Sequence, residues 1–124
     1  MKKDNKGLIF TNLVDFDMKW GHRNDFKSYA KGLEDFDLRL KEILDEMKDT
    51  DVLFITADHG CDPTMPGTDH SREHVPFLAY GKNLKENVNL GTRNSFADMG
   101  QTVAEILNVE KIKNGESFLK EIQN

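Results

Sequence analysis

The pattern of apolar and polar positions predicts one long helix flanked by short strands. Apolar side chains recur three or four positions apart from residue 25 to residue 48, which is typical of an amphipathic helix. Asn24 or Asp25 is suited to cap its start. Short apolar runs predict three buried strands, which are residues 7–14, 52–56 and 76–80. The chain therefore begins as strand, long helix, strand.

The last third of the chain predicts a second helix and a short strand. The run from Ser95 to Asp98 resembles a capping box with aspartate in the acidic position. The helix that follows carries its apolar residues on one face, namely Phe96, Met99, Val103, Ile106 and Leu107. Residues 115–119 are predicted to form a short edge strand.

These elements predict an α/β fold with a mostly parallel sheet and flanking helices. A strand, helix and strand in succession form a βαβ unit, whose strands lie parallel through a right-handed crossover. Asp17 then follows the end of the first strand, and Asp58 follows the end of the second. Because ligands bind at the carboxyl edge of such sheets, we expect both acids to lie there together. The 124 residues are enough for one domain with one core.

Charge narrows the classes of partner. The formal net charge is −5, and no basic block is present to neutralise the phosphates of a nucleic acid. No signal peptide or membrane-spanning run is visible, so we expect a cytoplasmic protein without a membrane partner. The one cysteine excludes an internal disulfide. An acidic protein that handles a phosphate ester needs bound cations to reverse the local potential.

Two acid–imidazole sets are the candidate chemistry of the chain. Asp58 and His59 are adjacent at the end of an apolar strand, and His70 follows in a loop that has few apolar residues. Asp17 and His22 form the second set, upstream. Carboxylate and imidazole groups are common metal ligands, and two such sets indicate a two-metal site that handles phosphate esters.

Most of these candidates also have a plainer interpretation. Asp58 could cap a turn beside an exposed His59. Asp15 competes with Asp17, because strand alternation puts both acids on one face. Cys61 could be a metal ligand or a nucleophile, but no basic neighbour that would lower its pKa is evident, so we interpret it as a bystander.

Three basic residues are secondary candidates. His74 directly precedes Val75 and Pro76 at the entry to a predicted strand, so we interpret it as structural or exposed. Arg72 and Arg23 are candidates for phosphate contact, because a guanidinium group matches a phosphate with two parallel hydrogen bonds.

Longer runs around these residues resemble the bacterial phosphopentomutases, which are alkaline-phosphatase-like metalloenzymes. The resemblance is to the C-terminal part of these enzymes and covers nearly the whole chain. It rests on residues 7–17, 29–33, 55–64, 66–70, 91–93 and 96–98. A match of this length is far more specific than an acid–histidine pair alone.

The resemblance implies an activity and a set of metal ligands. It implies the interconversion of (deoxy)ribose 1-phosphate and (deoxy)ribose 5-phosphate through a threonine that carries the phosphoryl group. It also implies two Mn²⁺ ions. By position, Asp58 and His59 resemble ligands of one ion, and Asp17, His22 and His70 resemble ligands of the other.

The chain also departs from the family it resembles. The family's first metal-binding aspartate, its phosphorylated threonine and its cap domain precede the region of resemblance. We therefore expect an incomplete C-terminal part of the metalloenzyme core, inactive alone, that associates with itself or with the missing N-terminal part. The alternatives are a fragment similar to the cofactor-independent phosphoglycerate mutases, or a non-catalytic metal-binding remnant. The run Cys61-Asp62-Pro63-Thr64 and the spacing from Asp17 to His22 favour the pentomutase.

Overall fold

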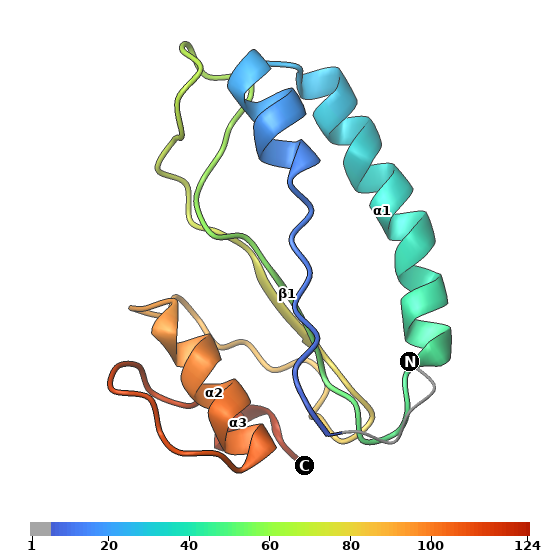
Figure 1. Ribbon diagram of the computed structural model, residues 1–124, viewed down its shortest axis with the longest axis vertical. Helices are drawn as coiled ribbons and strands as arrows, with labels where there is room; N and C mark the ends of the chain where they lie inside the picture. Colours follow the sequence, from blue (N-terminus) through green and yellow to red (C-terminus); the bar gives the residue numbers. More distant parts are fainter. Residues whose placement is uncertain (1–5) are drawn as a thin grey trace. The chain divides into compact units, whose positions relative to one another are not determined.

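The computed structural model describes residues 6–124, and these residues divide into two compact units (Figure 1). Residues 11–79 form one unit. Residues 80–124, together with the described residues 6–10, form the other. Among the described residues, no helix combines the length and the apolar character that spanning a membrane requires. That the whole chain belongs to one domain stays a prediction.

The long helix predicted from periodicity is confirmed as α1, Phe26–Glu46 (Figure 1). Asp25 caps it, because its side chain accepts a hydrogen bond of 3.0 Å from the backbone N–H of Ser28. None of its residues is buried, and Phe26 and Leu33 on the apolar face are 51% and 52% exposed. An amphipathic helix normally buries such a face against a neighbour. Within residues 11–79, part of this face stays uncovered.

Two helical turns, rather than a strand, lead into α1. They are the π-helix η1, Phe16–Trp20, and the 3₁₀-helix η2, Gly21–Arg23. Residues 7–14 form no strand, so that prediction is wrong for this structure. Ile9 and Phe10 are 76% and 78% exposed. A strand needs a hydrogen-bonded neighbour, and the sheet in the described part of the chain offers these residues none.

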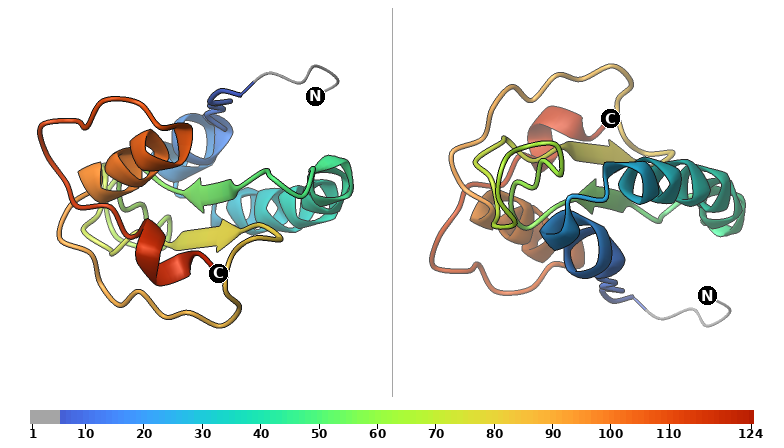
Figure 2. Two further views of the ribbon diagram at one scale, coloured as in Figure 1. Left: turned by 90° about the horizontal axis from the view of Figure 1, so that it is seen from below. Right: turned by 90° about the horizontal axis from the view of Figure 1, so that it is seen from above.

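The other two predicted strands are confirmed. They are β1, Leu53–Thr56, and β2, Phe77–Tyr80, which lie side by side in a two-stranded antiparallel sheet (Figure 2). The antiparallel pairing recurs beyond the strands, where Gly60 bridges Ser71. The expected parallel pair is not found among the described residues, because its first strand does not form. The mixed helix and strand content of the predicted α/β class is observed.

The unit of residues 80–124 holds the buried apolar residues of the described chain. It contains α2, Ala97–Leu107, and α3, Leu119–Ile122. Its core consists of Leu84, Ala104, Phe118 and Ile122. α2 confirms the predicted second helix, whereas the predicted edge strand at residues 115–119 is wrong. The chain turns there at Gly115, whose φ of 91° belongs to the left-handed region, and α3 begins at Leu119.

α2 begins differently from the predicted capping box. The Ser95 hydroxyl accepts a hydrogen bond from the backbone N–H of Ala97 at 3.1 Å. The Asp98 carboxylate does not return to Ser95 but accepts hydrogen bonds from Arg93 and from the backbone N–H of Glu116. The positions that α2 buries are Asp98, Gln101, Thr102 and Ala104. The predicted apolar face is therefore not the buried one in this unit.

Candidate metal centre

Asp17 is carried by η1, which aromatic side chains hold against α1. The ring of Phe16 contacts the rings of Trp20 and Tyr29 edge-on, with centroid distances of 5.1 and 5.2 Å. Trp20 also lies against Gly32, where an added Cβ would overlap the indole ring. Close packing of η1 on α1 therefore depends on a glycine in the second turn of α1. This packing fixes the backbone from which the Asp17 side chain projects.

Strand alternation predicted that Asp15 and Asp17 share one face, and the structure does not confirm this. Both residues lie at the start of a helical turn, where positions two apart point in different directions. The Asp15 carboxylate accepts a hydrogen bond of 2.8 Å from Nζ of Lys19 at the surface. Asp17 faces the histidines instead, and its side chain is 34% exposed. The structure therefore brings Asp17, and not Asp15, to the candidate group.

His22 lies on η2, immediately after η1. Its Nδ1 lies 2.5 Å from the carbonyl oxygen of Thr68, to which a proton on Nδ1 is donated. Its Nε2 lies 3.3 Å from Oδ1 of Asp17. An imidazole that donates from Nδ1 keeps the lone pair on Nε2 available to a metal ion.

His59 follows β1, and His70 lies on the segment that returns towards β2. Their rings stack, with centroids 3.8 Å apart and planes inclined by 26°. Their Nε2 atoms lie 3.7 and 3.3 Å from Oδ1 of Asp17. Nδ1 of His59 lies 3.0 Å from the carbonyl oxygen of Gly60, so donation from Nδ1 again leaves Nε2 with a free lone pair.

The oxygen Oδ1 of Asp17 is the centre of this group, and its surroundings fit a cation. It is buried and accepts no hydrogen bond, although three imidazole Nε2 atoms lie 3.3 to 3.7 Å away. A buried carboxylate oxygen without a donor costs free energy. One ligand atom from each of Asp17, His59 and His70 lies within 4.8 Å of the others. A metal ion bound by these oxygen and nitrogen lone pairs would remove that cost.

Asp58 and Cys61 lie at the margin of this group. The Asp58 side chain is 80% exposed, and its Oδ1 is 3.7 Å from Nε2 of His59. Partial burial raises the pKa of the Cys61 thiol, and the neighbouring carboxylate of Asp17 raises it further. A thiol with a raised pKa is a poor nucleophile at neutral pH, which agrees with the interpretation of Cys61 as a bystander.

The three basic residues named as secondary candidates do not lie with Asp17 and the histidines. Two residues that were not singled out from the sequence, Thr68 and Ser71, do contact this group or the loop that carries it. His74, Arg72 and Arg23 are all exposed. Thr68 contributes only its backbone carbonyl, to His22. Ser71 contributes its hydroxyl, which accepts a hydrogen bond of 2.6 Å from the backbone N–H of Asp62. No pattern of residue types marks such contacts, because they depend on how the loop folds back on β1.

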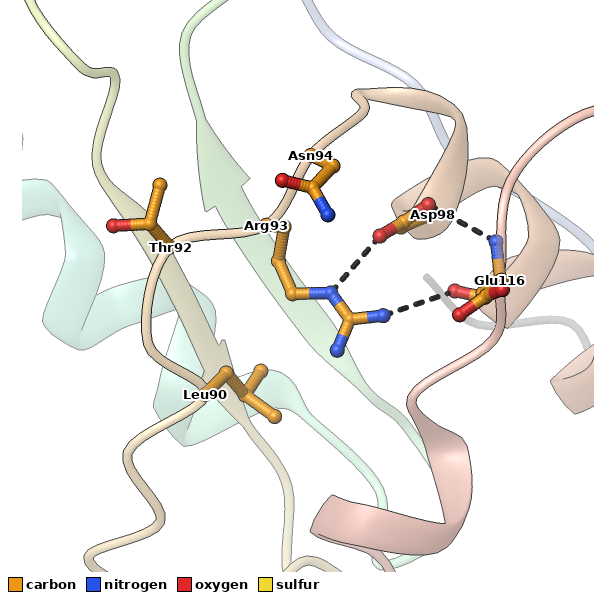
Figure 3. A pocket seen from close by; sticks show the side chains of 6 residues that line it. All are labelled: Leu90, Thr92, Arg93, Asn94, Asp98 and Glu116. Atoms are coloured by element: carbon orange, nitrogen blue, oxygen red, sulfur yellow. Dashed lines mark hydrogen bonds and ion pairs between the residues drawn. The ribbon is translucent and has the colours of Figure 1, made fainter.

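A second cluster of charged side chains surrounds a hollow of about 350 Å³ in the unit of residues 80–124 (Figure 3). Arg93 donates to the Asp98 carboxylate at 2.9 Å, to Oε1 of Glu121 at 3.1 Å and to the carbonyl oxygen of Glu116 at 3.4 Å. Its guanidinium group is therefore engaged by protein acceptors and also lies over the ring of Phe118, 5.4 Å from the centroid. This arrangement ties the loops of the unit to α2 and leaves little of Arg93 for a ligand.

Comparison with known proteins places the chain among metalloenzymes. A family model described as "Metalloenzyme superfamily" matches residues 1–111. The chain is 84% identical over 122 residues to the phosphopentomutase of Clostridium novyi (strain NT), which is 98% of this chain and 31% of that protein. It is 65% identical over 122 residues to the phosphopentomutase of Kosmotoga olearia, with the same coverage.

A third similar protein is the phosphopentomutase of Thermotoga maritima. It is 62% identical over 117 residues, which is 94% of this chain and 30% of that protein. The chain therefore spans about a third of the length of the curated relatives it matches. All five predicted ligands, Asp17, His22, Asp58, His59 and His70, lie within the residues that the family model matches.

Proposed function

The chain belongs to the metalloenzyme superfamily, and we propose that it supplies metal ligands to a phosphopentomutase. The activity proposed is the interconversion of ribose or deoxyribose 1-phosphate and the corresponding 5-phosphate. The observation that carries the proposal is the convergence of three imidazole Nε2 atoms on the orphaned oxygen of Asp17. Its pentose phosphate substrate is inferred from the relatives, each of which is called a phosphopentomutase.

Two Mn²⁺ ions are proposed as the cofactor, with Asp17, His22 and His70 at one ion and Asp58 and His59 at the other. The structure groups these residues in a way that supports part of this assignment, because Asp17, His22 and His70 lie together. His59 also faces Asp17, with Asp58 beyond it at the exposed margin.

Hydrogen bonds to the backbone orient two of the proposed ligands in the absence of an ion. Nδ1 of His22 and Nδ1 of His59 donate to backbone carbonyl oxygens, which fixes both rings with Nε2 towards Asp17. The bound ions would polarise the phosphoryl oxygens of the substrate. They would also offset the net charge of −5, which otherwise opposes the approach of a phosphate ester. The residues of this chain therefore orient the ligands and supply the negative charge that retains the cations.

The rest of the predicted sheet is proposed to form in the complete protein. Residues 7–14 would be a strand of a mostly parallel sheet, in the C-terminal part of an alkaline-phosphatase-like core. The exposure of Leu8, Ile9 and Phe10, at 63%, 76% and 78%, supports this proposal, because three consecutive apolar side chains in water are unfavourable. Backbone amides of these residues should exchange with solvent quickly in this chain and slowly in the complete enzyme.

A chimaera tests the proposed activity. The chain replaces the matching 122-residue segment of the Clostridium novyi enzyme, and conversion of ribose 5-phosphate to ribose 1-phosphate is measured with Mn²⁺. The chimaera should be active, because the segments are 84% identical. His59→Ala should abolish turnover, whereas His74→Ala, which removes an exposed histidine outside the group, should preserve it. A folded chimaera without turnover, or equal losses in both variants, would contradict the proposal.

Titration of the 124-residue chain separates the pentomutase from a metal-binding remnant. Calorimetry with Mn²⁺ should show binding that Asp17→Asn weakens and Asp15→Asn leaves unchanged, because only Asp17 faces the imidazoles. The isolated chain should not turn over pentose phosphates, since the resemblance assigns it no nucleophilic threonine. Turnover by the isolated chain would require a nucleophile among its own residues, and an inactive chimaera that binds Mn²⁺ would indicate the remnant.

A further inference from the structure

The segment that carries His70 is fastened to the segment that carries His59 at a single bridged pair. Gly60 and Ser71 form an isolated antiparallel β-bridge, in which the N–H of Ser71 donates to the carbonyl oxygen of Gly60 at 3.3 Å. Each histidine directly precedes one member of this pair. Successive side chains of extended segments alternate between faces, so the residues next to a bridged pair share the opposite face from it. The bridge therefore determines whether the two rings can meet.

Two features stabilise this bridge, namely the hydroxyl of Ser71 and the absence of a side chain at Gly60. The Ser71 hydroxyl accepts a hydrogen bond of 2.6 Å from the backbone N–H of Asp62, so Ser71 engages the opposite segment at two points. A Cβ at Gly60 would lie 2.6 Å from the carbonyl oxygen of Ser71 and 2.7 Å from the backbone nitrogen of Glu73. The segments thus approach more closely than any side chain at position 60 allows. The Ser71 hydroxyl is the side-chain group of this contact that a substitution can remove.

We propose that Ser71 is a positioning residue, whose hydroxyl fixes the register in which His70 stacks on His59 and both rings face Asp17. This inference rests on the proposed function, because it assigns Ser71 a role towards the metal ions of that site. The stack of 3.8 Å and the Nε2 distances of 3.3 and 3.7 Å to Asp17 Oδ1 are the geometry that the hydroxyl maintains. A ligand whose ring is not held in orientation binds its metal ion more weakly.

Ser71→Thr and Ser71→Val test this role, because the two variants have nearly the same shape and differ in the hydroxyl. Both are made in the 124-residue chain, with Ser117→Ala as the control, whose hydroxyl accepts from the N–H of Leu119 at 3.2 Å in the other unit. Calorimetry measures Mn²⁺ affinity, and nuclear Overhauser spectra of the metal-free chain measure ring–ring cross-peaks between His59 and His70. Circular dichroism verifies that each variant keeps its helix content.

Ser71→Val should lower the Mn²⁺ affinity roughly 10- to 100-fold, as the loss of supporting contacts around metal ligands does, and should weaken the cross-peaks between His59 and His70. Ser71→Thr and Ser117→Ala should leave both readouts close to those of the unsubstituted chain. The proposal is overturned if the two variants at position 71 behave alike, or if the control loses as much. If the unsubstituted chain takes up no Mn²⁺, the proposed function fails, and the cross-peaks alone decide the role of Ser71.

Discussion

Asp98→Asn should lower the stability of the unit of residues 80–124 against local opening, although the substitution keeps the shape of the side chain. The Asp98 carboxylate is buried and accepts hydrogen bonds from Nε of Arg93 at 2.9 Å and from the N–H of Glu116 at 3.0 Å. It also lies in the first turn of α2, where the helix dipole favours negative charge. An asparagine has one acceptor oxygen for these two donors, and its amide N–H₂ would face the other.

The size of the effect follows from what the substitution removes. A hydrogen bond to a charged group contributes about 1.5–3 kcal/mol, and the lost charge at the helix start adds a few tenths to ~1 kcal/mol. Asparagine retains one of the two hydrogen bonds, so the net loss should be about 2–3 kcal/mol. Since each 1.4 kcal/mol is tenfold in an equilibrium constant, local opening should become roughly 30- to 150-fold more frequent.

Amide hydrogen exchange of this unit measures that opening directly. The N–H groups of Glu116 and Phe118, which bond to Asp98 and Thr102, should exchange faster by this factor. Asp45→Asn is the control, because it disrupts an exposed pair with Lys41 on α1. The hydrogen bond from Glu116 and the contact with Arg93 hold the pKa of Asp98 below its usual value, in spite of burial.

The pH dependence follows from the direction of that shift. A carboxylate whose pKa is lowered by folding stabilises the fold above its unfolded pKa, and this contribution is lost as pH falls through the folded pKa. The difference between Asp98→Asn and the parent should therefore be full at neutral pH and shrink in strong acid. Unchanged exchange of the Glu116 amide in Asp98→Asn, or a difference independent of pH in the acid range, would refute this account of Asp98.

The other predictions concern the core, the aromatic packing and the metal ligands. Phe118→Ala should cost about 3–5 kcal/mol in chemical denaturation followed by circular dichroism, because Phe118 is 1% exposed, whereas Phe96→Ala, at 61% exposed, should cost far less. Gly32→Ala should shift the fluorescence of Trp20 despite the higher helix propensity of alanine, because the new Cβ displaces the indole ring; unchanged emission would argue against this packing. Mn²⁺ affinity measured by calorimetry should fall on acidification, since protonated imidazole binds no metal, and a flat profile would exclude histidine ligands.

Helix α1 and strands β1 and β2 could be predicted because their signals are local. The apolar spacing over residues 25–48 and the cap at Asp25 determine α1 without reference to the rest of the chain. The strand at residues 7–14 carries an equally clear apolar run, but a strand forms only when a neighbour accepts and donates its hydrogen bonds. The prediction of a strand at residues 115–119 was wrong for another reason. Gly115 turns the chain, and Phe118 is buried where α2 packs on α3.

The candidate metal ligands were predicted to meet through a topology that is not found among the described residues. From the sequence, Asp17 and Asp58 were expected to meet at the carboxyl edge of two parallel strands, whereas in the structure Asp58 is 80% exposed and lies at the margin of the group. In the structure, η1 brings Asp17 in by packing on α1, and the antiparallel return after β1 brings His70 back to His59. The residue types led to the same group of side chains because carboxylates and imidazoles are the usual protein ligands of metal ions, whichever topology brings them together.

This route through a hairpin has a physical consequence for the candidate centre. His59 and His70 belong to the same antiparallel loop between β1 and β2, so their contact depends on how the loop pairs at Gly60 and Ser71. Asp17 and His22 belong to the turns before α1. The hydrogen bond from His22 to the carbonyl oxygen of Thr68 links these turns to the same loop between β1 and β2. Each of these contacts lies within residues 11–79. The candidate metal centre is therefore formed within this unit, and its contacts are present while the side chains of residues 8–10 are exposed.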